Sequence, residues 1–328
     1  DVLGRLDITE VGEALTDIST ATLAGALTAS TAAVEAERGT MPTRMSIILM
    51  GRLGGGEVGY GSDADVMFVH DPVEGADQKE AADAAMAVAQ GLRKMLAAPS
   101  DDPALVVDAD LRPEGKNGPL VRTFAAHQAY YEKWSAVWEA QALLRASATV
   151  GDAGLNERFT ALIDPLRWPE GGATATEVRE VRRIKARVDS ERLPRGANAK
   201  THLKLGRGGL ADVEWTVQLL QMQHAHAVPE MRTTRTLDAL HAAVKADLVS
   251  HDDAHTLESA WRLVSRIRNA VVLLRNKPAE SMVEQAGERA GVAHLLGYGM
   301  EHGERMVDDY LRTTRHARQV VERIFYES

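Results

Sequence analysis

The stretch GRLGGGEVGYGSDADVMFVH, residues 51–70, decides how the first part of this chain folds. The apolar run MSIILM, residues 45–50, precedes this stretch, and the stretch itself ends in a second apolar run, VMFV, residues 66–69. Two apolar runs of this kind are typical of two buried strands. Between the two runs stand glycines, which tolerate the backbone conformations of a tight turn. We therefore predict a strand, a glycine-rich turn and a second strand that Pro72 ends.

Asp63 and Asp65 stand two residues apart at the head of the second strand. Side chains at this spacing share one face of a strand, and two carboxylates held so close repel each other unless cations lie between them. Mg²⁺ accepts carboxylate oxygens together with phosphate oxygens. A third candidate, Asp108, lies on another apolar strand. An isolated Asp-x-Asp is more often an exposed turn, but in this apolar context three carboxylates predict a two-metal site.

The glycine-rich turn is suited to binding a polyphosphate. Gly54, Gly55 and Gly56 would let backbone amides approach phosphate oxygens without obstruction by side chains. The hydroxyl of Ser62 would add one more donor. We expect these residues to bind the triphosphate of a nucleotide.

Residues that follow Asp108 add two cations and a further acid. Arg112 and Lys116 could pair with phosphate oxygens or with an acceptor protein, although an exposed structural role suits each equally well. Asp110 faces the same way as Asp108 on a strand. Which of these two acids is the third metal ligand therefore stays open.

Helical and extended patterns alternate through the first part of the chain. Apolar residues recur at helical spacing over residues 8–38, an Ala-rich helix is expected over 78–98, and a third strand over 104–113. After Arg122, helical periods dominate. The helices expected there cover residues 124–147, 153–165, 174–191, 209–226, 234–246, 252–276 and 303–325.

The expected fold class is thus α+β. A mixed α/β domain with a small mixed sheet and a leading helix is predicted over residues 1–123, followed by a mostly α-helical bundle domain over residues 124–328.

The composition limits the classes of function. Lys and Arg total 38 against 47 Asp and Glu in 328 residues, a net charge of −9, so the chain as a whole is unsuited to binding nucleic acid. The absence of cysteine excludes a thiolate metal site and fits a reducing cytosol. No apolar run approaches the roughly 18 residues of a membrane span. We expect a cytoplasmic protein with no nucleic-acid or membrane partner, and, because the chain opens on Asp1, a piece of a longer polypeptide.

The glycines, the Ser-Asp-x-Asp of residues 62–65 and the later Asp108 resemble the signature of the DNA polymerase β-like nucleotidyltransferases. Within that superfamily, residues 51–71 resemble the motif of the glutamine synthetase adenylyltransferase/adenylyl-removing family. Further stretches that resemble this family are DADLRPEGKNGPLV (108–121), YYEKWSAVWEAQALLRA (130–146), KLGRGGLADVEWTVQLLQ (204–221) and MRTTRTLDAL (231–240). One departure is Asp110, which stands where the family usually has a basic residue.

The resemblance implies an enzyme that transfers AMP from ATP to a tyrosine hydroxyl of glutamine synthetase. It implies Mg²⁺ or Mn²⁺ as cofactor, glutamine synthetase as protein substrate and the PII signal protein as regulator. The family enzyme resembles two tandem copies of this architecture, one adding AMP and the other removing it by phosphorolysis. Gly59-Tyr60 and the end of the chain soon after an amphipathic helix favour the adenylylating copy, with the AMP-removing copy as the alternative.

The residue types suggest a mechanism. Two metal ions bridged by Asp63 and Asp65 would neutralise the triphosphate and orient the α-phosphorus for in-line attack. A tyrosine hydroxyl has a pKa of about 10, so the attacking group needs a base, and Asp108 is the candidate.

Two further functions stay open. One is another nucleotidyltransferase, acting on RNA ends or antibiotics, which the acidic balance and the helical stretches respectively disfavour. The other is a non-catalytic module that senses a nucleotide, which the full set of carboxylates disfavours.

Other motifs favour structural roles. Gly206–Gly209, followed by Asp212 and Glu214, resemble a second phosphate loop, but they open a helix, and a role in starting and packing that helix is favoured. His251 and His255 have the spacing of a metal pair, yet no third ligand stands out, so capping of a helix after Ser250 is favoured. Tryptophans at helical core spacing are expected to pack in the core. They are Trp134, Trp138 and Trp215.

Overall fold

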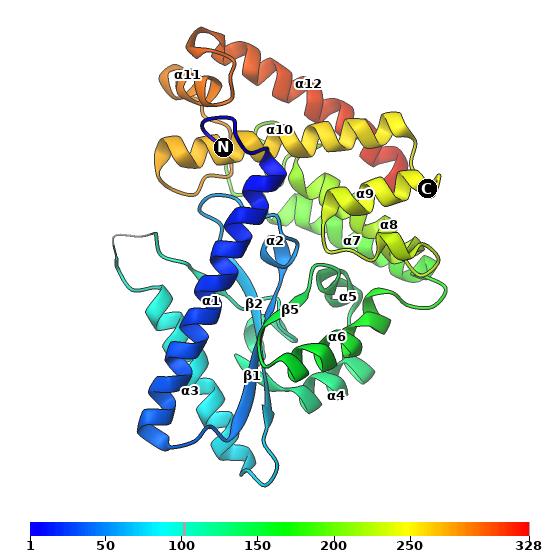
Figure 1. Cartoon of the computed structure of the whole chain (residues 1–328). Coiled ribbons are helices and arrows are strands. Elements are labelled where there is room, and N and C mark those ends of the chain that lie inside the picture. The colour runs from blue at the N-terminus through cyan, green and yellow to red at the C-terminus, as the bar shows by residue number, and fades with distance from the viewer. Residues whose placement is uncertain (101–102, 328) are drawn as a thin grey trace. The chain divides into compact units, whose positions relative to one another are not determined.

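The computed structural model describes residues 1–100 and 103–327, which form two compact units (Figure 1). The sheet unit holds Glu13–Val58 and Ser62–Pro169, and the helical unit holds Asp1–Gly12, Gly59–Gly61 and the chain from Glu170 onward. The expected fold class is confirmed, because a mixed α/β part with a five-stranded sheet precedes a mostly helical part. The domain boundary after residue 123 stays a prediction, since units defined by contacts need not end where independently folding domains end.

The elements up to residue 169 mix helices and strands. They are α1 Ile8–Arg38, β1 Thr43–Leu49, α2 Gly51–Gly54, β2 Ala64–Pro72, α3 Gln78–Leu96, β3 Val107–Asp108, the 3₁₀ turn η1 Gly115–Asn117, β4 Val121–Thr123, α4 Phe124–Trp134, α5 Val137–Leu143, β5 Ser147–Gly151 and α6 Ala153–Arg167. The sheet runs β3-β2-β1-β5, with β4 also paired to β2. β1 is antiparallel to β2 and β5, whereas β2 is parallel to β3 and β4.

The sheet separates two apolar layers. Ile47 and Leu49 belong to the core that includes residues of α1 and α3, whereas Ile48 lies in the core that includes residues of α4, α5 and α6. Figure 1 shows α1 and α3 on one side of the sheet and α4, α5 and α6 on the other. Met67 of β2 belongs to the second core. Because side chains two apart on a strand share a face, Asp65 projects on the side of Met67.

The single helix expected over residues 124–147 is wrong. The chain forms α4, breaks at Ser135, forms α5 and then adds the strand β5. The break has a specific cause, because the Glu139 carboxylate accepts a hydrogen bond from the Ala136 amide at 2.8 Å and so starts a new helix. Trp134 ends α4 with 71% of its surface exposed, so the expectation that it packs in the core is also wrong.

The helical unit contains all five helices expected after residue 170 and adds one, α11. Its elements are α7 Ala175–Glu191, α8 Leu210–His224, the 3₁₀ turn η2 Pro229–Met231, α9 Thr236–Lys245, α10 His251–Arg275, α11 Ala286–Leu295, the 3₁₀ turn η3 Met300–His302, α12 Gly303–Val321 and the π-helical turn η4 Glu322–Glu327. α10 packs against α8, α9, α11 and α12. Ser250 caps α10 by accepting a hydrogen bond from the Asp253 amide, as expected.

A buried charge network holds the start of α8. Asp212 accepts a hydrogen bond from the Gly208 amide at 2.7 Å and forms ion pairs with Lys185 at 2.6 Å and Arg318 at 3.0 Å. Burial is the largest influence and would raise the pKa of Asp212. Attraction to Lys185 and Arg318, together with the hydrogen bonds from Lys185 and the Gly208 amide, outweighs it and holds the pKa below its ordinary value. The glycines at 206–209 thus open a helix, with Gly209 as its N-cap, as the sequence indicated.

Across the described parts of the chain, no helix combines the length and the apolar composition that spanning a membrane requires.

Candidate active site

Three carboxylates converge at one end of the parallel pair β2–β3. Asp65 of β2 is the register partner of Asp108 of β3, and Asp63 directly precedes β2. One carboxylate oxygen from each of the three residues lies within 4.8 Å of the others. Asp63 is exposed, and the other two are half-buried. The structure therefore brings together three residues that lie up to 45 positions apart in the sequence.

This donor set fits a hard divalent cation. Carboxylate oxygens are the ligands that Mg²⁺ and Mn²⁺ prefer, and three negative charges this close need a counter-charge. Sites that hold two such ions place them about 3.5–4 Å apart, bridged by shared carboxylates. The acidic triad is therefore consistent with a metal site, and Asp63, Asp65 and Asp108 are the residues that would hold the ions.

Gly51 fits tightly against this triad. The Met50 amide donates a hydrogen bond to the Asp65 carbonyl at 2.8 Å, so the start of α2 is tied to β2. Gly51 then adopts φ +53°, and a Cβ on it would lie 2.2 Å from Oδ2 of Asp65. Only glycine leaves room for the carboxylate here. No pattern in the sequence singles out Gly51 for this role, because it is one of several glycines in the stretch.

The predicted phosphate-binding glycines lie against Arg145. A Cβ on Gly54 would be 1.9 Å from the Arg145 carbonyl oxygen, and one on Gly55 would be 2.2 Å from a terminal guanidinium nitrogen. Gly56 has φ +71°, and the half-buried Ser62 directly precedes Asp63. Close packing thus accounts for Gly54 and Gly55, and contact of these residues with a nucleotide stays a prediction.

The sequence analysis did not predict the buried ion pair between Glu57 and Arg145. A terminal nitrogen of Arg145 donates to Oε2 of Glu57, and both side chains are only 7% exposed. The Nε of Arg52 donates to the Glu57 carbonyl at 2.7 Å. Neither Glu57 nor Arg145 lies in a metal-binding sequence pattern, so only the tertiary structure shows that these two residues meet beside the glycines.

The residues after β3 form a turn next to the triad. Asp110 lies in this turn outside the triad, where its amide donates to Asp108 Oδ1 at 2.7 Å and its carboxylate pairs with Lys116 at 3.1 Å. Arg112 donates to the carbonyls of Ala109 and Gly118 at 2.7 and 3.0 Å, so it stabilises the turn. The Lys116 side chain is 81% exposed. Binding of metal by Asp110, and of nucleotide by Arg112 and Lys116, stays a prediction.

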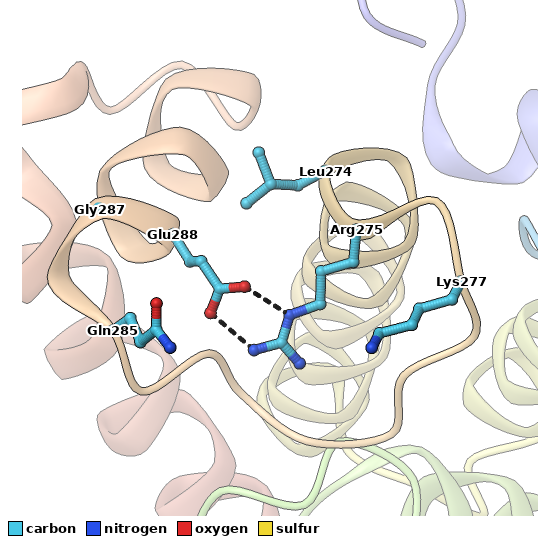
Figure 2. A pocket seen from close by; sticks show the side chains of 6 residues that line it. All are labelled: Leu274, Arg275, Lys277, Gln285, Gly287 and Glu288. Atoms are coloured by element: carbon cyan, nitrogen blue, oxygen red, sulfur yellow. Dashed lines mark hydrogen bonds and ion pairs between the residues drawn. The ribbon is translucent and has the colours of Figure 1, made fainter.

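A separate open pocket of about 640 Å³ lies in the helical unit (Figure 2). Its lining includes a bidentate ion pair between Arg275 and Glu288, with nitrogen–oxygen distances of 2.9 and 2.7 Å. The pairing holds the pKa of Glu288 below its ordinary value. These charges satisfy each other, and no residue of the triad lines the pocket.

Comparisons with known proteins support the resemblance inferred from the sequence. Residues 1–162 match the model of the GlnE family, glutamate-ammonia ligase adenylyltransferase, and residues 181–327 match that of GlnD PII-uridylyltransferase. Bifunctional glutamine synthetase adenylyltransferase/adenylyl-removing enzymes are similar across nearly the whole chain. The one from Streptomyces avermitilis is 54% identical over 96% of the chain, and those from Mycolicibacterium smegmatis and Mycobacterium tuberculosis are 51% and 50% identical over 99%. The chain spans 31%, 32% and 33% of these relatives, about a third of their length.

Proposed function

We propose that this chain, which matches the GlnE model over residues 1–162 and the GlnD PII-uridylyltransferase model over residues 181–327, is one nucleotidyltransferase half of a glutamine synthetase adenylyltransferase/adenylyl-removing enzyme. In this proposal it transfers AMP from ATP to a tyrosine hydroxyl of glutamine synthetase and thereby lowers the activity of that enzyme. Glutamine synthetase as substrate, the PII signal protein as regulator and the cytoplasm as location are all part of the proposal.

The observation that carries the proposal is the acidic triad. Ligand oxygens of Asp63, Asp65 and Asp108 lie within 4.8 Å of one another, beside a glycine turn that follows β1. Nucleotidyl transfer needs this combination, because the triphosphate carries a high negative charge that must be neutralised and oriented before attack at phosphorus. A site for a neutral ligand would have no use for three clustered carboxylates.

The transfer breaks the bond between the α-phosphorus and the bridging oxygen and forms a bond between that phosphorus and the tyrosine oxygen. Pyrophosphate leaves, and the hydroxyl proton must be accepted. When bound, Mg²⁺ or Mn²⁺ supplies charge neutralisation for the triphosphate and for the leaving pyrophosphate. Asp108 is the candidate to accept the proton, and the amides of Gly54–Gly56 and the hydroxyl of Ser62 are candidates to bind phosphate oxygens.

The direction of the reaction is a separate part of the proposal. Gly59-Tyr60, which precede Gly61-Ser62-Asp63, resemble the adenylylating half more than the AMP-removing half. The alternative is the AMP-removing half, in which inorganic phosphate attacks the phosphorus of the tyrosine–AMP linkage. The bond from that phosphorus to the tyrosine oxygen breaks, the tyrosine hydroxyl is regenerated, and ADP is formed. The same triad suits both directions, because each is an in-line displacement at the same phosphorus.

The test follows label from ATP to protein. The chain is incubated with α-labelled ATP, Mg²⁺ and unmodified glutamine synthetase, and labelled synthetase is measured. We expect transfer by the wild type and none by Asp65→Asn. If instead no label is transferred, and phosphate-dependent ADP release from adenylylated synthetase is observed, the chain is the AMP-removing half. Inactivity in both directions, with nucleotide binding retained, would favour a nucleotide-sensing module.

A further inference from the structure

The buried ion pair Glu57–Arg145 joins two distant segments of the sheet unit. Glu57 follows the glycine turn, and Arg145 lies between α5 and β5. Each side chain is only 7% exposed. Removing two charges from water is costly, and a buried pair contributes little net stability compared with apolar residues of the same volume. The pair therefore calls for a reason other than stability.

Arg145 contacts the glycine turn with both its main chain and its side chain. Its carbonyl oxygen occupies the space that a Gly54 side chain would need, at 1.9 Å from the Cβ position. Its guanidinium occupies the space beside Gly55, with three atoms at 2.2 to 2.8 Å from that Cβ position. The planar guanidinium thus forms a flat support for the turn.

Glu57 fixes the other side of the same turn. Its amide donates to the Arg52 carbonyl at 2.9 Å, and its own carbonyl accepts from Arg52 Nε at 2.7 Å. These two bonds close the segment from Arg52 to Glu57 into a ring. The Glu57 carboxylate also accepts a hydrogen bond from Arg145, so this closed segment is tied to the guanidinium.

The segment that leads into the glycine turn contacts Asp65 of the acidic triad. The helix α2 that leads into it begins at Gly51, whose Cβ position is 2.2 Å from Asp65 Oδ2, and the preceding Met50 amide binds the Asp65 carbonyl. A shift of the turn would therefore alter the space around the Asp65 carboxylate. Contacts run continuously from Arg145 through the glycines to Asp65.

We infer that Glu57 and Arg145 are positioning residues, which hold the glycine turn in the conformation that binds the nucleotide and that orients Asp65. The inference rests on the proposed function, because it assigns the turn to a nucleotide and the triad to metal ions. It adds to that function two residues that bind neither ligand directly. Outer residues that orient ligands of a metal typically change affinity or activity by about 10–100-fold when they are replaced.

The test measures binding rather than turnover. The whole chain is prepared as wild type, Glu57→Gln, Arg145→Met and the double variant. Dissociation constants are measured for Mn²⁺ alone by electron paramagnetic resonance, and for α,β-methylene ATP by calorimetry, well below each thermal midpoint. We expect each single variant to bind the analogue about 10–100-fold more weakly. The double variant should lose no more affinity for the analogue than the single variant that binds it more weakly, because both changes release the same turn.

Arg167→Met is the matched control. Its guanidinium is also mostly buried in the sheet unit, where it binds Asp164 at 2.8 Å and the Ala146 carbonyl at 3.0 Å. This variant should lower the thermal midpoint and keep wild-type affinities. If Arg145→Met does not fold, Arg145→Lys replaces it, because lysine keeps the charge but lacks the flat surface on which Gly55 packs.

The outcomes are distinct. Weaker binding in the pair variants but not in Arg167→Met supports the inference. Wild-type affinities in the pair variants, with only their thermal midpoints lowered, would show a merely structural pair and overturn it. If the wild type itself binds neither Mn²⁺ nor the analogue, the proposed function fails, and the inference fails with it.

Discussion

Asp65 and Asp108 are register partners in the parallel pair β2–β3. Neighbouring strands lie about 4.8 Å apart, and paired residues project on the same face, so the two carboxylates stand side by side. Together with Asp63, they concentrate negative charge at one end of the sheet. The proposed metal site would therefore depend on both residues, which leads to the first prediction.

Replacing Asp108 by Asn should abolish transfer, because it removes a charge from the triad and the candidate base. We expect at least about a 100-fold loss of turnover, and weaker Mn²⁺ binding, measured by label transfer and metal titration. Asp110→Asn should affect metal binding less, because Asp110 lies outside the triad and pairs with Lys116. Equal losses of Mn²⁺ affinity in the two variants would instead make Asp110 a ligand.

Replacing Gly51 by Ala should displace the Asp65 carboxylate. The added Cβ would lie 2.2 Å from Asp65 Oδ2, on a backbone with φ +53°. We expect a loss of stability of about 1–3 kcal/mol and loss of activity, measured by urea unfolding and label transfer. Gly25→Ala is the control, since it lies in α1 with open space around its Cβ position. It should stabilise the protein by about 0.5–1 kcal/mol without changing activity, and equal behaviour of the two variants would contradict the prediction.

Acid should weaken the sheet unit through His127. Burial lowers the pKa of His127 from 6.5 to about 4. Between these values the unfolded chain binds a proton that the folded protein does not, so stability falls as the pH falls from 6.5 toward 4. The loss from this residue is about 3 kcal/mol in full.

The measurement is urea unfolding at pH 7 and pH 5. His127→Gln should reduce the difference in unfolding free energy between the two pH values. His255→Gln should not, because His255 is exposed on α10. An unchanged pH dependence in His127→Gln would exclude this residue as a source of acid sensitivity.

Asp212→Asn should destabilise the helical unit strongly. The change leaves Lys185, whose side chain is 1% exposed, without its full counter-charge and weakens the bond to the Gly208 amide. Breaking a buried ion pair on one side costs about 3–5 kcal/mol. Glu180→Gln breaks the solvent-exposed pair with Arg183 and should destabilise the protein much less, because water screens that pair. Unfolding in urea compares the two, and similar losses would refute the role given to Asp212.

The sequence predicted the elements of the sheet unit best where a periodic pattern was long. The helix over residues 8–38 and the Ala-rich helix near 78–98 agree with α1 and α3, because their apolar spacing extends over many turns. It failed for β5, whose residues Ser147–Gly151 are mostly exposed or half-buried. This strand is held by pairing with β1, which local sequence does not encode.

The sequence by itself determined which residues carry charge and which turn carries glycines, and so it was sufficient to predict the carboxylates Asp63, Asp65 and Asp108. Only the tertiary structure decided that Asp108 rather than Asp110 joins the triad, and that Glu57 and Arg145 meet beneath the glycines. The physical reason is the separation along the sequence between the residues that interact. Spacing along a strand fixes which side chains share a face, but the register between strands, and the contact of residues 88 positions apart, depend on how the whole sheet and its two cores pack.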